Sequence, residues 1–154
     1  MLIYVSLQQQ RGVPTMNGET YAIIPEVIVP RFLSPDKVRS QEGQVLLNLH
    51  YGRQRTREET ERTYISWGQL PEAVGNFGPW VGPVIVGLTL GALIRLVELL
   101  GYGQDLLSKC GLESLVIGVL LIGSYETVAS TLSAACFQSF LMIEGLNIYL
   151  RQQR

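Results

Sequence analysis

Residues 79–100, PWVGPVIVGLTLGALIRLVELL, decide the fold of this chain. The fifteen residues 80–94 carry no charge, and Arg95 and Glu98 stand one helical turn apart near the far end. A helix of about 20 mostly apolar residues crosses the hydrocarbon core of a bilayer. Trp80 stands where an interfacial aromatic belongs, and the long side chain of Arg95 can reach the opposite headgroups. We therefore predict a membrane-spanning helix over residues 79–100.

The glycines of this stretch bear on the main alternative, a buried helix of a soluble protein. Gly82, Gly87 and Gly91 recur at intervals of five and four residues. Such small residues let a neighbouring helix pack closely in lipid, whereas in water glycine weakens a helix. The pattern therefore favours a membrane helix over a soluble core helix.

The distribution of charge divides the chain into two parts. Of the 25 charged residues, sixteen precede Pro79, and they balance, so the formal net charge of the whole chain is −1. We expect a polar extramembrane region over residues 1–78 and a transmembrane region over residues 79–154. Without a basic excess, nucleic acid is not an expected partner.

A second apolar stretch, residues 112–150, is too long for one crossing. Glu126 and the residues before it interrupt it, which predicts spans near 112–124 and 128–150 in addition to the one near 79–100. Lysine and arginine collect on the cytoplasmic side of membrane proteins. Three spans place the basic residues of the first connector and of the tail on that side together, with residues 1–78 outside: Arg95, Lys109, Arg151, Arg154. The predicted fold class is mainly α, an integral membrane protein with two or three transmembrane helices after an irregular, partly helical extramembrane loop region.

Prolines dominate the first apolar part of the polar region. Pro25, Pro30 and Pro35 fall five residues apart, and because proline disfavours helix across it, residues 21–37 are expected to be extended. A helix of one or two turns is expected from an N-cap at Ser40 to a stop at Gly52, and a short helix from Pro71.

The residue types exclude several kinds of site. His50 is the single histidine, and Cys110 and Cys136 lack the spacing of metal ligands. Nucleotide-binding and serine-hydrolase motifs are absent from the sequence. We therefore expect no metal and no cofactor.

Arginine and lysine in the polar region suggest binding of an anion at the membrane surface. Guanidinium groups suit the oxygens of a phosphate or a diphosphate. The predicted substrate-binding residues are five cations and one polar neighbour of the membrane boundary: Arg31, Lys37, Arg39, Arg53, Arg55 and Asn76. The alternative is a solvated charged face, which we expect for Arg57 and Arg62 beside Glu58, Glu59 and Glu61.

Glu72 is the candidate catalytic residue, because it lies directly before the first predicted span. A carboxylate at the water–lipid boundary can accept a proton from a sugar hydroxyl. The alternative is a structural carboxylate that favours the positive end of the helix begun by Pro71.

Two segments in this order resemble the bacterial oligosaccharide repeat-unit polymerases, the O-antigen-polymerase-like membrane proteins. They are IPEVIVPRFLSPDK at residues 24–37 and ISWGQLPEAVGNFGPWVGPVIVGLTLG at residues 65–91. The elements that carry the resemblance are Pro30-Arg31, Pro35-Asp36-Lys37, Ser66-Trp67-Gly68, Glu72 and Asn76-Phe77-Gly78, and the similarity covers residues 23–92. Residues 1–78 then correspond to the large external loop of the family, and the hydrophobic C-terminus is compatible with its last helices.

The resemblance implies a metal-independent glycosyltransferase that joins oligosaccharides carried on undecaprenyl diphosphate. It implies the bacterial inner membrane, with the N-terminal region on the periplasmic side. Arg31, Lys37 and Arg53 or Arg55 would hold the diphosphate, and Glu72 would be the base. Family members have about ten or more spans, so the chain is expected to need missing N-terminal helices or a partner membrane protein, and to be inactive alone. The alternative is a small non-enzymatic accessory subunit of a larger membrane complex.

Overall fold

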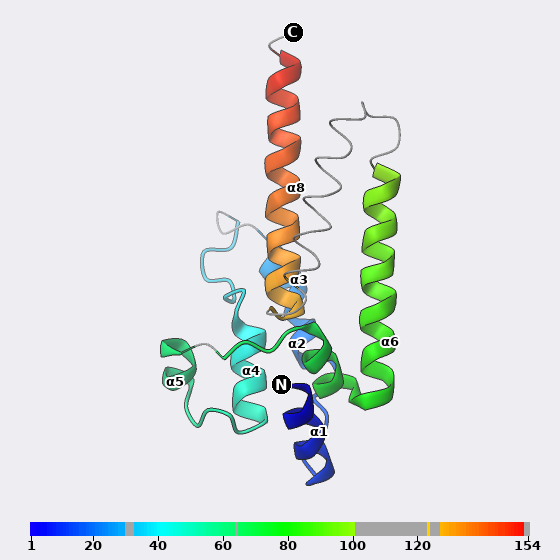
Figure 1. The fold of residues 1–154 in the computed structure, drawn as a ribbon. Helices are drawn as coiled ribbons and strands as arrows, with labels where there is room; N and C mark the ends of the chain where they lie inside the picture. The colour runs from blue at the N-terminus through cyan, green and yellow to red at the C-terminus, as the bar shows by residue number, and fades with distance from the viewer. Residues whose placement is uncertain (30–32, 64, 101–122, 124–126, 153–154) are drawn as a thin grey trace.

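The computed structural model describes residues 1–29, 33–63, 65–100, 123 and 127–152 (Figure 1). Over these residues the fold is mainly helical and contains no strand, which confirms the predicted mainly α class. The helices are α1 (Leu2–Gln10), α2 (Glu19–Ala22), α3 (Ile24–Ile28), α4 (Glu42–His50), α5 (Arg57–Arg62), α6 (Gln69–Leu100) and α8 (Ala129–Gln152).

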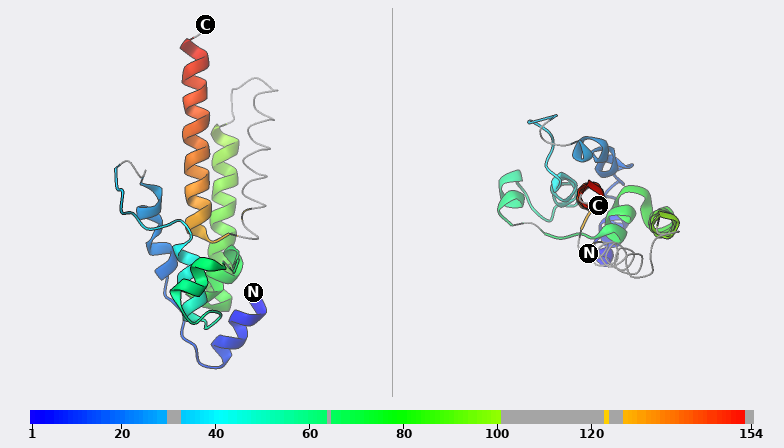
Figure 2. Two further views of the ribbon diagram at one scale, coloured as in Figure 1. Left: turned by 90° about the vertical axis from the view of Figure 1, so that its left-hand side faces the viewer. Right: turned by 90° about the horizontal axis from the view of Figure 1, so that it is seen from above.

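The molecule has two parts of different shape. Helices α1 to α5, the segments between them and the start of α6 form a cluster of short helices, which we call the helical base. From it α8 and the rest of α6 rise as two long helices that run in the same direction (Figures 1 and 2). The N-terminus lies in the base and the C-terminus at the far end of α8.

Helix α6 is two helices joined at a sharp bend. Gly78 has φ +84°, a left-handed conformation that glycine adopts without steric cost. The bend brings Gly82 against the preceding arm of the helix, where an added Cβ would lie 2.6 Å from backbone atoms of Ala73 and Val74. Helical conformation is confirmed over residues 79–100 and for the segment from Pro71, although the helix begins two residues earlier at Gln69, and Gly78 separates the two stretches.

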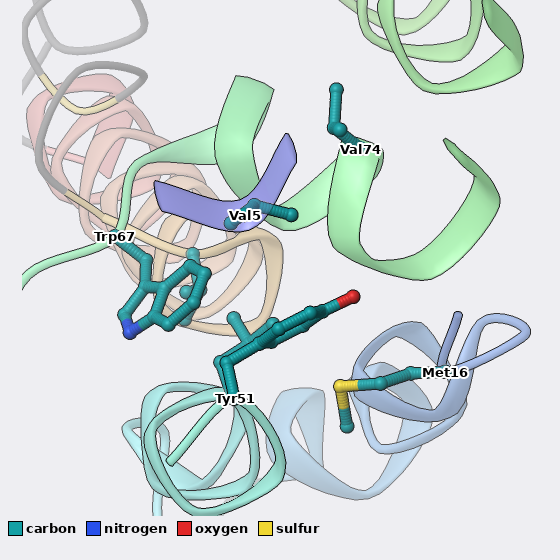
Figure 3. Packing of buried hydrophobic residues seen from close by; sticks show 7 residues of the cluster. Val5, Met16, Tyr51, Trp67 and Val74 are labelled. Carbon is teal, nitrogen blue, oxygen red and sulfur yellow. The ribbon is translucent and has the colours of Figure 1, made fainter. Parts of the chain in front are cut away.

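Aromatic and aliphatic side chains from distant segments form the core of the base (Figure 3). The rings of Tyr51 and Trp67 lie 5.6 Å apart between centroids. Both polar ends are paired: Trp67 Nε1 donates to Asn48 Oδ1 (2.6 Å) and the Tyr51 hydroxyl donates to the Gly75 carbonyl (2.7 Å). The other buried members of this cluster are Val5, Met16, Leu47, Val74 and Val128.

The expectation of an extended chain over residues 21–37 is wrong for its first part. Helix α3 contains Pro25 in its first turn, where the missing N–H has no helical partner to lose. The extended conformation appears at Val29 (ψ 127°), immediately before Pro30. This helical turn lets residues 24–28 pack against α8.

The remaining helix predictions have mixed outcomes. The helix expected between Ser40 and Gly52 is confirmed as α4, although its N-cap is Gln41. The stretch predicted near 128–150 is helical, as α8. The stretch near 112–124 lies outside the described residues except for Gly123. In the described part of the chain, one helical stretch, Gln69–Ala92, is long and apolar enough to cross a membrane.

Candidate functional site

A cationic cleft lies beside the start of α4. It has a volume of about 460 Å³, and three basic and two acidic residues contribute to its lining. The lining residues are Ile23, Lys37, Val38, Arg39, Glu42, Leu46, Arg57 and Glu61. Two of the predicted substrate-binding residues, Lys37 and Arg39, are therefore brought together here.

Lys37 also has a structural role at the end of α3. Its ammonium group donates to the carbonyls of Val27 (2.8 Å) and Val29 (2.6 Å). These carbonyls end the helix and lack helical partners, so the cation satisfies them and favours the negative end of the helix. Because an ammonium group has three donors, one is left by the contacts with the described residues and is open to a ligand.

Carboxylates already hold the arginines of the cleft. Arg57 donates to both oxygens of Glu42, and its Nε lies 3.5 Å from Glu61. Arg39 lies 3.6 Å from the same Glu61 and is mostly exposed. The three cations and two carboxylates leave an excess of one positive charge, and of the two arginines Arg39 has the weaker pairing with carboxylates.

An apolar groove adjoins the cleft and runs between α3 and α8. It has a volume of about 320 Å³, and Lys37 lines it as well as the cationic cleft. Its other lining residues are Val27, Ile28, Ala134, Phe137, Gln138 and Leu141. The two hollows therefore place a hydrophobic surface and a positively charged one on either side of Lys37.

The other predicted cations do not line the cleft. The guanidinium of Arg53 lies 5.1 Å from the ring centroid of Tyr4, in a cation–π contact. Arg55 is exposed, and its backbone N–H donates to Glu59 Oε2 (2.9 Å). Arg31 lies outside the described residues.

Glu72 and Asn76 lie together, away from the cationic cleft and fully buried in the base. Glu72 Oε1 accepts from the Thr20 hydroxyl (2.7 Å), and Glu72 Oε2 accepts from the backbone N–H of Ala129, the first residue of α8 (2.6 Å). Asn76 Nδ2 donates to Thr20 Oγ1 (2.9 Å) and to the Glu72 carbonyl (2.8 Å). A single carboxylate thus joins α2, α6 and α8, and we call this set of contacts the Glu72 network.

Burial sets the protonation of this network. It raises the pKa of Glu72 to about 7, although the hydrogen bonds from Thr20 and Ala129 favour the charged form and act in the opposite direction. Burial and then the Glu72 charge raise the pKa of Tyr21 well above its usual range. As folded, the Glu72 carboxyl is shielded from solvent, so it can act as a base only when the network opens.

Thr20 and Glu42 are polar partners that were not predicted from the sequence, whereas Glu61, expected beside Arg57, pairs with it. Thr20 lies in a helix of four residues, which is too short to show a helical repeat of apolar residues in the sequence. Glu42 lies fifteen positions from its partner Arg57. Among the described residues, no group of three or more His, Cys, Asp or Glu side chains could hold a metal ion. Comparison with protein-family models, with curated proteins and with solved structures found no match to this chain.

Proposed function

We propose that this chain is the membrane-embedded C-terminal part of an oligosaccharide repeat-unit polymerase, and that it binds the diphosphate of a lipid-linked oligosaccharide. One observation carries the proposal: Lys37 lines both the cationic cleft and the apolar groove. An isoprenoid diphosphate has the same division, since an apolar chain is joined directly to an anion.

The exposed apolar surface of α6 supports membrane insertion. Beyond the bend, Trp80, Val84 and Leu88 are 87%, 59% and 70% exposed, which in water would leave a large apolar strip uncovered. Residues 69–77 instead pack inside the base, so the proposed spanning segment begins at Pro79 and leaves Glu72 outside it. Its 22 residues extend about 33 Å, enough for the bilayer core.

The direction of the long helices supports three crossings rather than two. Helices α6 and α8 both run away from the base (Figure 1). Two consecutive crossings must be antiparallel, so parallel crossings require a third between them. On this topology the base lies on the periplasmic face of the bacterial inner membrane, as the positive charges of the connector and tail also favour.

The chemistry assigned to the cleft is leaving-group stabilisation. A sugar hydroxyl oxygen attacks the anomeric carbon, the bond from that carbon to the diphosphate oxygen breaks, and the diphosphate leaves with the electron pair. Lys37 and Arg39 stabilise the charge that grows on it. The hydroxyl proton goes to a general base, a role that Glu72 does not fill as folded because it is buried away from the cleft.

Exposure of α6 further suggests that the active assembly contains more membrane helices. Gly87 and Gly91 have no atom within 4 Å of the position of an added Cβ, so a neighbouring helix could approach them closely. We propose that upstream helices of the polymerase or a partner membrane protein pack there and complete the substrate cavity.

Binding of undecaprenyl diphosphate to the purified chain in phospholipid nanodiscs tests the proposal. The Arg39→Gln variant removes the more weakly paired arginine of the cleft, and we expect about tenfold weaker binding because a charge-assisted bond to phosphate is lost. Arg55→Gln is the matched control, since it removes an exposed arginine outside the cleft. Undecaprenol, which lacks the diphosphate, should bind much more weakly.

Two results would contradict the proposal. One is equal binding of undecaprenol and undecaprenyl diphosphate. The other is a loss for Arg55→Gln as large as the loss for Arg39→Gln, which would move the anion site away from the cleft.

A non-enzymatic accessory subunit is the second candidate function. The observation that favours it is that Lys37 and Arg57 each have a partner within the fold. Lys37 bonds to the Val27 carbonyl and Arg57 bonds to Glu42, so both residues have a structural role. If the wild-type chain binds no lipid diphosphate but co-purifies from native membranes with a larger membrane protein, this alternative is supported. Loss of that association on Gly87→Leu would locate the contact on α6.

A further inference from the structure

We propose that the Glu72 network is a proton-dependent latch, closed when the carboxyl is protonated, that holds the start of α8 against α2 and α6. This inference stands on the network itself. It does not depend on whether the cationic cleft binds a lipid diphosphate.

The geometry makes Glu72 a junction of three elements that are distant in sequence. Thr20 lies 52 positions and Ala129 57 positions from it, and each bonds to a different oxygen of the same carboxyl group. Glu72, Thr20 and Asn76 each have no exposed surface. A change in the protonation of this carboxyl therefore alters the contacts that α6 makes with α2 and with the first residue of α8.

Few other charges act on the carboxyl. In α2 the titratable neighbour is Tyr21, which stays neutral because its pKa is raised, while Glu19 is exposed. In the described part of α6 before the bend Glu72 is the sole ionisable residue, and residues 129–135 of α8 carry none. In the described base no cation pairs with Glu72, so its charge is balanced by Thr20 and the Ala129 N–H alone.

The direction of the switch follows from linkage between protonation and conformation. Burial raises the pKa of Glu72 from 4.5 to about 7, so the closed network binds the proton more tightly than a hydrated, open one does. A rise of pH through this range therefore favours opening. Opening also hydrates Asn76 Oδ1, which is buried without a hydrogen-bond partner among the described residues.

Other contacts keep the opening local. The hydroxyls of Ser130 and Thr131 both donate to the Ser40 carbonyl, each at 2.9 Å. These bonds keep α8 attached beside α4 when the bond from Ala129 to Glu72 is released. The opening is therefore confined to the contact of Ala129 with Glu72 and to the facing parts of α2 and α6.

Hydrogen exchange of the peptide covering residues 127–134 tests the latch in nanodiscs of neutral phospholipid. Protection factors, corrected for the intrinsic pH dependence of exchange, are compared at pH 5.5 and pH 8.5. For the wild-type chain we expect protection to fall at least about tenfold at the higher pH. Glu72→Gln should remove this dependence, because the amide can still accept from Ala129 but does not titrate, and Glu19→Gln, at the exposed neighbour of Thr20, should retain it.

A wild-type protection factor that is the same at both pH values would overturn the proposal, as would an equal fall in Glu72→Gln. Thr20→Val provides an independent variant if Glu72→Gln does not fold. It removes a hydrogen bond that favours the charged carboxylate, so the midpoint of the transition should move to higher pH. An unchanged or lower midpoint in Thr20→Val would count against the latch.

Discussion

The helical base and the long arm of α6 differ in which side chains they bury and which they expose. In the base, Trp67 is 2% exposed and its indole N–H is paired, and even a carboxyl group is buried with partners on both oxygens. Beyond Gly78, Trp80 is 87% exposed and the neighbouring apolar side chains follow it outward. The base has the organisation of a small packed core, whereas α6 beyond the bend leaves its apolar side chains uncovered, as the proposed membrane location requires.

Gly78 marks the change from buried side chains to exposed apolar ones. Gly78 turns the chain, and nearly every residue that carries the buried polar network precedes the turn. The exception is the start of α8, which returns to the base and bonds to Glu72. The bond to Glu72 is therefore a titratable contact between the two parts of the molecule, beside the bonds from Ser130 and Thr131 to Ser40.

The largest expected effect is the loss of the core tryptophan. Trp67→Ala removes the largest buried side chain and leaves Asn48 Oδ1 without its donor. We expect the base to lose about 3–5 kcal/mol of unfolding free energy. Trp80→Ala should change it by less than about 0.5 kcal/mol. Denaturant unfolding followed by circular dichroism compares the two, and equal losses would break the distinction between the regions.

The second effect concerns the pH dependence of the stability of the base. Because the pKa of Glu72 is about 7 in the fold and 4.5 ordinarily, the folded base holds the proton more tightly than the unfolded chain. Its contribution to stability is complete below pH 4.5 and is lost as the pH rises to 7, by on the order of 3 kcal/mol. Thermal unfolding of Glu72→Gln should lack this decline, and an identical decline in both proteins would assign it to another group.

The third effect separates two glycines of α6. A Cβ at Gly82 would lie 2.6 Å from backbone atoms of Ala73 and Val74, so Gly82→Ala should strain the bend and cost about 1–3 kcal/mol. Gly87 has open space around it, and Gly87→Ala should be neutral or slightly stabilising. Thermal unfolding in one detergent measures both, and a larger loss at Gly87 would show that the packing of the bend is wrong.

The smallest effect is expected on the surface of the base. Arg57→Gln breaks the ion pairs with Glu42 and Glu61, but the Arg57 side chain is 55% exposed, so the loss should stay below about 1 kcal/mol. Glu61→Gln, which leaves the bidentate contact with Glu42 intact, is the control and should cost less. A loss of several kcal/mol in Arg57→Gln would mean that the cleft is held together by this arginine.

Helices with a clear local signal could be predicted from the sequence. The apolar run after Pro79 and the segment before Gly52 are both helical. They could be predicted because their signals, a long uncharged run and a glycine that ends the helix, involve residues that are close in sequence. The same reasoning failed at Pro25, since proline is compatible with the first turn of a helix as well as with an extended chain.

Contacts between distant residues could not be predicted. Glu72 and Asn76 were singled out from the sequence as neighbours of the predicted membrane boundary, but their burial depends on Thr20 and on the first residue of α8. The predicted cationic clamp is divided for the same reason, since α4 separates Arg39 at its start from Arg53 beyond its end. Only the packing of α3, α4 and α5 decides which cations share a cleft.

The most direct test of the proposed membrane location uses the two tryptophans, one in each region. Tryptophan emission is measured in bilayers that contain phospholipids brominated on the acyl chain, which quench only rings in contact with lipid. We expect quenching in the wild-type chain and almost none in Trp80→Phe, whose remaining emission comes from the buried Trp67. Unquenched wild-type emission, or equal quenching of Trp80→Phe, would contradict the account, because α6 would then not face lipid beyond Gly78.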